Sequence, residues 1–494
     1  MIRKLVVVAL IQLTSLSIAS AAPLSNEDVK WLNRMTYGIN SQAIESYQTQ
    51  GRQRYLDLQL TNQADDKLPA NVNDMLSKLL IEQEPVEKIA QDLHREFQRI
   101  RKLPKPERRL AHKALTKSEN QLMHEAVQRH LLRALYSPAQ IKEQMTWFWL
   151  NHFSVFRGKG DVRWLVADYE KSAIRPHALG KFRDLIKATL RHPAMLIYLD
   201  NSHNAASKIN ENYARELMEL HTLGINGGYS QQDVQELSRI LTGAEVNWDN
   251  QPPKLNKKLE PYYRHEGGFE FNPKRHDFGD KQFLGKKISG DGYAEIEQVI
   301  DMLAKHPSTA NFISRKLAVY FVSDAPSVGL VEKLAKTFQT TDGDIAATLR
   351  TLFASKEFTD SLGKKISDPM HYVLATLRFA YDGQLLSEVD SVTRWLDGLG
   401  EPLYGHLTPD GYGMTEKDWI SPNQLTKRFE TAKQIVNNEL SSNSVLKNQK
   451  LANKPLYQII EPILSAQTKV ALEKAASPKE WNIFLLSAPE FIYR

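Results

Sequence analysis

Apolar residues recur every three or four positions through most of this 494-residue chain, and this spacing restricts its fold more than any other feature. The spacing is that of amphipathic helices, whereas the alternation typical of strands is scarce. We therefore predict a mainly α protein, built as a multi-helix orthogonal bundle. Helices are expected over residues 26–37, 44–60, 121–135, 137–152, 168–190, 210–224, 230–242, 294–322, 327–338 and 344–353.

Two long stretches lack this helical spacing. Residues 247–293 are rich in Pro, Gly, Asn and Lys, and residues 398–422 contain several Pro and Gly. Long connections of this kind are more often functional than passive, so a site built on a helical scaffold is expected at such loops. We treat residues 22–494 as one region, which divides into a helical lobe at 22–246, a loop insertion at 247–293 and a second helical lobe at 294–494.

The N-terminus has the pattern of a secretory signal. Arg3 and Lys4 precede a short apolar stretch at 5–18, and Ala19-Ser20-Ala21 forms a small-residue cleavage site. We predict a signal peptide at 1–21 and a periplasmic or secreted protein; the alternative is an uncleaved N-terminal anchor. No other segment approaches the roughly 20 apolar residues of a membrane span, so no transmembrane span is expected after cleavage.

The chain contains no cysteine and has a formal net charge of +6. Disulfides and thiolate metal sites are therefore excluded, and any metal must be bound by His, Asp, Glu or backbone oxygen. Residues 88–133 carry twelve Lys or Arg against five Asp or Glu. This basic segment is either a solvated helix face or a surface for nucleic acid, anionic lipid or acidic glycan. Export argues against nucleic acid as a partner.

Residues 210–224 place an unusual number of ionisable side chains in one expected helix. At 100° per residue, Arg215 lies one turn from both Glu211 and Glu219, which predicts either an ion-pair ladder or part of an active site. His221 falls in the apolar sector of the same helix. It is either a core histidine or an acid–base group that faces a pocket.

Two further segments carry candidate chemistry. Asn151 and His152 follow an aromatic cluster at the end of a predicted helix, where they either cap the helix or face a polar pocket. His276 and Asp277 lie in the first irregular stretch, followed by Lys281, and can ligate a metal or support acid–base chemistry. The chain lacks a Walker A loop, a Gly-x-Gly-x-x-Gly phosphate loop and a Gly-x-Ser-x-Gly elbow. Nucleotide-driven and ordinary serine-hydrolase chemistry are therefore not indicated.

Together these motifs resemble the "domain of unknown function 1800" family of exported bacterial proteins. The resemblance rests on residues 34–38, 149–153, 210–224, Gly227-Gly228-Tyr229, Asp233, Glu236, 241–243, His276-Asp277, Lys281, Gly285, His306-Pro307, 409–412 and Trp419. One departure is that Ala244-Glu245 follows Gly243 where the family usually has Trp; Trp248 takes that place a few residues later. Genes of the family commonly neighbour those of a sulfatase-like family, "domain of unknown function 1501". The resemblance thus implies a partner but no reaction.

We expect a hydrolase-type enzyme that acts on envelope or environmental polymers, with a divalent metal as the candidate cofactor. Glu or His would be the general base, and Arg215 would bind an anionic group. The predicted catalytic residues are Glu211, Arg215, Glu216, Glu219 and His221; the other pocket residues are Asn151, His152, Asn210, Asn212 and Lys281; the metal ligands are His276 and Asp277. The alternative is a non-catalytic assembly or maturation partner of an exported sulfatase-like protein, in which these side chains form a closed, paired network.

Overall fold

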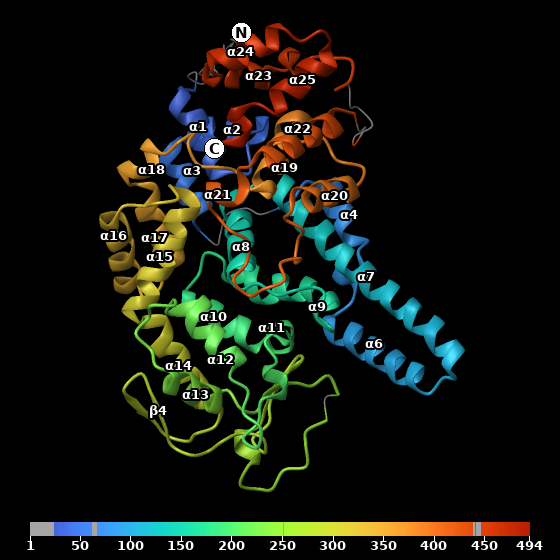
Figure 1. Ribbon diagram of the computed structural model, residues 1–494, viewed down its shortest axis with the longest axis vertical. Coiled ribbons are helices and arrows are strands. Elements are labelled where there is room, and N and C mark those ends of the chain that lie inside the picture. The colour runs from blue at the N-terminus through green and yellow to red at the C-terminus, as the bar shows by residue number, and fades with distance from the viewer. Residues whose placement is uncertain (1–23, 62–66, 250, 438–439, 441–445) are drawn as a thin grey trace, which may run out of the picture.

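The computed structural model describes residues 24–61, 67–249, 251–437, 440 and 446–494 (Figure 1). The predicted signal peptide at 1–21 lies outside these residues. In the described part of the chain there are 26 α-helices and only five short strands, which confirms the mainly α prediction. None of these helices is long and apolar enough to cross a membrane.

The N-terminal helices are short and locally capped. Helix α1 begins with a capping box, in which the Ser25 and Asp28 side chains each bind the other's backbone N–H. Gly51, at a φ of +74°, separates α2 from α3. The first five helices are α1 (Asn26–Met35), α2 (Ser41–Gln50), α3 (Arg52–Gln59), α4 (Ala70–Ser77) and α5 (Leu80–Gln83).

A helical hairpin projects from the body of the molecule (Figure 1). It consists of α6 (Val86–Arg101) and the first part of α7 (Lys105–Tyr136). Helix α7 has 32 residues and is therefore about 48 Å long. Its buried side chains are concentrated between Leu122 and Tyr136, so its C-terminal half joins the core while its N-terminal half extends outward.

The centre of the molecule is built around α8 (Gln140–His152), where Trp149 is fully buried and almost every other side chain is buried as well. The elements that follow in chain order are α9 (Val162–Asp168), η1 (Tyr169–Ile174), η2 (Arg175–His177), α10 (Phe182–Arg191), α11 (Pro193–Tyr198), η3 (Asn201–His203), α12 (Asn212–Glu216), η4 (Leu217–Thr222) and α13 (Gln231–Ile240). Elements η1 and η4 are π-helical turns, which are rare and often occur at functional sites.

The stretch 247–293 is less irregular than predicted. It contributes most of two small antiparallel sheets. One has the order β1-β3-β2, and the other pairs β4 with β5. In the first sheet, Glu245 lies directly opposite Glu270. The strands are β1 (Ala244–Val246), β2 (Arg264–Glu266), β3 (Phe269–Phe271), β4 (Lys281–Phe283) and β5 (Lys286–Ile288), with the turn η5 (Glu260–Tyr262) before β2.

The second half of the chain is helical again. The predicted helix at 294–322 is two helices, because Pro307 opens a new helix that the His306 side chain caps through the Ser308 N–H. The elements are α14 (Tyr293–Lys305), α15 (Pro307–Phe321), α16 (Val328–Thr340), α17 (Ile345–Phe353), α18 (Lys356–Asp360), α19 (Pro369–Tyr381), α20 (Asp390–Leu399), α21 (Glu416–Trp419), α22 (Pro422–Asn437), η6 (Leu451–Asn453), α23 (Pro455–Ile460), η7 (Glu461–Ile463), α24 (Ala466–Glu473), α25 (Pro478–Leu486) and α26 (Pro489–Ile492).

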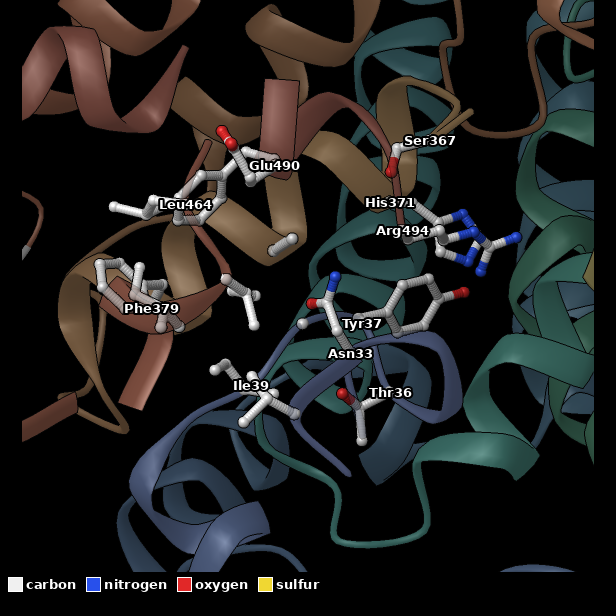
Figure 2. Close-up of a pocket in the computed structure, with 16 residues that line it drawn as sticks. Asn33, Thr36, Tyr37, Ile39, Ser367, His371, Phe379, Leu464, Glu490 and Arg494 are labelled. Carbon is white, nitrogen blue, oxygen red and sulfur yellow. The ribbon is translucent and has the colours of Figure 1, made fainter. Parts of the chain in front are cut away.

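The last residues of the chain return to the first helix. Buried Arg34 of α1 donates to the backbone oxygens of Ser361 and Arg494. A small cavity of about 30 Å³ lies at this junction, where Tyr37, His371 and Arg494 form its polar end (Figure 2). A space of this size holds one or two water-sized groups, so we assign it a packing role.

Candidate active site

Helix α8, turn η4 and helix α15 bring His152, His221 and Lys316 together. The two imidazole rings are 5.9 Å apart, and Lys316 Nζ lies 2.9 Å from His152 Nδ1. His152 Nε2 lies 3.0 Å from the backbone oxygen of His221. A carbonyl oxygen only accepts, so Nε2 carries the proton and Nδ1 accepts from Lys316. Burial lowers the pKa of His152 well below its usual value, which keeps the ring neutral.

His221 is fully buried, as its place in the apolar sector predicted. Neither of its ring nitrogens has a hydrogen-bond partner within the described part of the chain. Burial, reinforced by the charge of Lys316, lowers the pKa of His221 to about 3. An unpaired buried polar group costs about 1–3 kcal/mol, so such a side chain is more readily explained by function than by stability.

Lys316 is half-buried, and its only hydrogen-bond partner among the described residues is His152. Lys316 also forms no ion pair with any of the described residues. Burial lowers the pKa of Lys316 to about 8, while the charge of Asp410 acts in the opposite direction. An amine with this pKa is partly neutral near physiological pH and can therefore accept a proton.

Three carboxylates interact electrostatically with Lys316 or with one another. Burial raises the pKa of Glu216, and the charges of Glu219 and Asp410 raise it further. Asp410 therefore acts electrostatically on both Lys316 and Glu216. We call the six side chains together the Lys316 cluster: His152, His221, Lys316, Glu216, Glu219 and Asp410.

Asn151 anchors the loop that carries Asp410. Its side-chain amide donates to the Tyr412 carbonyl at 2.9 Å, and its side-chain oxygen accepts from the Tyr412 N–H at 2.6 Å. Gly411 makes this approach possible, because a Cβ there would lie 2.1 Å from the Asn151 backbone oxygen. The second irregular stretch thus folds onto the end of α8. The Asn151 side chain positions the loop by binding the backbone of Tyr412.

The predicted metal ligands belong to a separate set of side chains, which we call the Glu295 network. His276 Nε2 and Lys281 Nζ lie 2.9 Å and 2.6 Å from the two oxygens of Glu295, and all three side chains are fully buried. His276 Nδ1 lies 2.8 Å from the Thr242 carbonyl. The contacts of this network and those of His152 and His221 share no residue.

The donor atoms of this network do not fit a metal. Both nitrogens of His276 are engaged, and Arg239 holds the two oxygens of Asp277 at 2.8 Å and 3.2 Å. Within the described residues, no three His, Asp or Glu side chains form a group that could hold a metal ion. We therefore derive no step through a metal, and the metal site stays a prediction.

The remaining predicted residues lie nearer the surface. Arg215 pairs with Glu211 at 3.0 Å, which forms one step of the expected ladder. Glu219 instead lies 3.5 Å from the hydroxyl of Tyr229. The reason is that the expected single helix becomes a π-helical turn at Leu217, which changes the angular position of every later residue.

Asn210 and Asn212 support the turn before α12. The Asn210 side-chain oxygen accepts from the Asn212 N–H at 3.0 Å, and the Asn212 amide donates to the Leu199 carbonyl at 3.2 Å. These contacts are local and structural. The catalytic roles assigned to Glu211 and Arg215, and the pocket roles of these two asparagines, stay predictions.

Sequence reasoning missed Lys316 and did not assign a role to Asp410. A signal for Lys316 was present, since it follows buried Ile313 by three residues and precedes buried Tyr320 by four. A lysine on the apolar face of a helix must either reach solvent along its stem or meet a buried polar group. Asp410 lies in a loop, where spacing carries no information about its neighbours.

An open cleft of about 470 Å³ lies beside α10, on the side of the helix that faces away from its first residue, Phe182. Its wall includes the pair of Asp168 and His192, whose side chains lie 2.9 Å apart. His192 Nδ1 also accepts from the Ala194 N–H, so both ring nitrogens are engaged. The cleft is large enough for a ligand, but this histidine has no free nitrogen for acid–base chemistry.

Comparison with known proteins places the chain in a family. The family model described as "Protein of unknown function (DUF1800)" matches residues 30–493. The chain therefore belongs to this family, as the motifs predicted. The searches of the curated proteins and of the solved structures give no match.

Proposed function

We propose that this protein is an exported, hydrolase-type enzyme whose general base is Lys316, acting on envelope or environmental polymers. The observation that carries the proposal is a half-buried lysine with a pKa lowered to about 8, no ion-pair partner in the described residues, and a buried histidine that accepts from it. Export is expected from the N-terminal residues.

The cluster contains a base and an acid whose pKa values are shifted in opposite directions. Neutral Lys316 would take a proton from an attacking water molecule, and His152 would hold the amine in place by accepting from it. Glu216, whose pKa is raised, would protonate the leaving group. The two free ring nitrogens of His221 are buried, so they would reach the substrate only when binding exposes the ring.

The charge of the cluster restricts the substrate. With Lys316 neutral and Glu216 protonated, the carboxylates of Glu219 and Asp410 outweigh the single charge of nearby Arg215, so the surroundings are net negative. A polyanionic chain would be repelled there, so the proposal favours a polymer that is neutral or cationic at the reacting bond. This conclusion departs from the initial expectation that Arg215 binds an anionic group.

The test compares Lys316→Met and Lys316→Arg with the wild type on purified envelope polysaccharide and peptidoglycan. We expect the wild type to cleave the polymer. The cleavage rate should fall about 10²–10⁴-fold in both variants, because removal of a general base typically slows a reaction by this factor. Lys356→Met, which removes an exposed lysine paired with Asp360 in α18, is the matched control. Wild-type rates in Lys316→Met would refute the proposal.

The alternative function, a non-catalytic partner of a sulfatase-like exported protein, is favoured by the closed Glu295 network. Paired buried charges of this kind are expected where helices are locked together rather than where chemistry occurs. The two functions separate in a co-expression experiment with the sulfatase-like neighbour. If the neighbour requires this chain for its activity and Lys316→Met serves as well as the wild type, the partner function holds.

A further inference from the structure

The excess positive charge of the protein is concentrated at the end of the projecting hairpin. Residues 101–117 contain seven Lys or Arg and a single acidic residue, Glu107, a net charge of +6. The formal net charge of the whole chain is also +6, so the rest of the sequence is balanced. The seven basic residues are Arg101, Lys102, Lys105, Arg108, Arg109, Lys113 and Lys117.

These cations are not used inside the molecule. None of the seven forms an ion pair within the described residues, although other exposed Lys and Arg do. Arg108 alone donates to a backbone oxygen, that of Leu103. The other six are exposed. The charge of this hairpin end is therefore available to an outside partner.

Large apolar side chains are exposed among the cations. Leu110 is 72% exposed and Phe97 42% exposed. Lys113 and Lys117 follow Leu110 at three and seven residues, so they share its face of α7. A face that combines cations with exposed apolar groups is typical of helices that lie at a lipid interface.

We propose that the hairpin end, residues 97–117, docks onto an anionic lipid surface. The cations would be attracted to acidic headgroups, while Leu110 and Phe97 would enter the boundary of the acyl chains. The hairpin projects from the body, so its end can reach a membrane plane without the helices of the core approaching it (Figure 1). An acidic glycan would match the charge but would leave the exposed leucine unexplained. This proposal does not depend on the proposed enzymatic function.

The test measures binding of the mature protein to vesicles by co-sedimentation. Vesicles of phosphatidylcholine alone are compared with vesicles that also contain phosphatidylglycerol. We expect binding to the anionic vesicles only, with an affinity that falls as salt is added. The triple variant Arg109→Glu, Lys113→Glu, Lys117→Glu should weaken binding at least tenfold, and Leu110→Ser should weaken it severalfold.

The matched control changes three exposed lysines elsewhere, Lys254→Glu, Lys257→Glu and Lys258→Glu, and should retain most of the binding. Circular dichroism of each variant checks that the helices are intact. Equal binding to both kinds of vesicle, or equal losses in the two triple variants, would overturn the proposal. So would tighter binding to a soluble acidic polysaccharide that Leu110→Ser leaves unchanged.

Discussion

Two groups of His, Lys and Glu side chains differ in how completely they are paired. In the Glu295 network each oxygen of Glu295 faces a donor, and both nitrogens of His276 are engaged. In the Lys316 cluster the lysine reaches a neutral histidine, and His221 has two unpaired nitrogens. The same residue types thus produce a closed network at one place and an open one at the other.

Under the proposed function, this difference separates side chains that stabilise the fold from side chains that act in catalysis. Closed pairing offsets the free-energy cost of removing charges from water. For an unpaired buried group, no hydrogen bond or ion pair offsets this cost. A protein retains such groups where they act on a ligand, because activity and stability often conflict at a site. The comparison predicts that substitutions in the two groups have opposite effects on stability.

The largest effect is expected for Glu295→Gln. The amide keeps the volume but leaves the buried Lys281 ammonium without a charged partner, so the free energy of unfolding should fall by about 3–5 kcal/mol. Glu297→Gln on the same helix removes a half-exposed ion pair and should cost less than about 1 kcal/mol. Urea denaturation measures both, and equal losses would contradict the closed-network interpretation.

The sharpest contrast is between His276→Leu and His221→Leu. The first breaks three polar contacts and should destabilise the fold by about 2–3 kcal/mol. The second removes two unpaired nitrogens and should leave the free energy of unfolding unchanged or raise it, while abolishing any activity. Thermal unfolding compares the two; a large loss in His221→Leu would show that its ring is structural.

A smaller effect is expected from pH. The pKa of His221 is about 3 in the folded protein, against about 6.5 in an unfolded chain. The unfolded chain binds the extra proton between these values, so stability is complete above about pH 6.5 and falls as the pH drops toward 3. Between pH 7 and pH 5 this histidine should remove about 2 kcal/mol. The variant His221→Leu should lose about that much less stability than the wild type between the two pH values. Urea denaturation at pH 7 and pH 5 measures both losses, and equal losses in the two proteins would contradict the prediction.

The smallest effect is expected for Arg215→Ala. Its pair with Glu211 is half-exposed, and such i,i+4 pairs contribute below about 0.5 kcal/mol. A loss above about 1 kcal/mol in chemical denaturation would mean that the ladder is structurally important. Loss of activity without loss of stability would restore the predicted catalytic role of Arg215.

The sequence predicted the helical fold and placed His221 in the apolar sector of its helix, because both follow from the spacing of apolar residues. We expected the segments of His152, His221 and His276 to meet in one cleft, but only His152 and His221 lie together. The sequence did not predict that His276 and Asp277 pair with Glu295 and Arg239, because those contacts join distant segments. The π-helical turn at Leu217 was also missed, since it depends on packing rather than on local propensity. For the same reason Lys316, which meets His152 only in the folded chain, was passed over.

The central claim is that Lys316 has an unusually low pKa, and the rate of its acetylation as a function of pH tests this most directly. The folded protein is labelled briefly and then digested. Mass spectrometry of the peptides measures the acetylation of Lys316 and of the exposed reference Lys254 in the same sample. We predict half-maximal reactivity of Lys316 near pH 8, about two pH units below the ordinary pKa of a lysine side chain. Coincident profiles for the two lysines, with Lys316 labelled as readily as Lys254, would contradict the account.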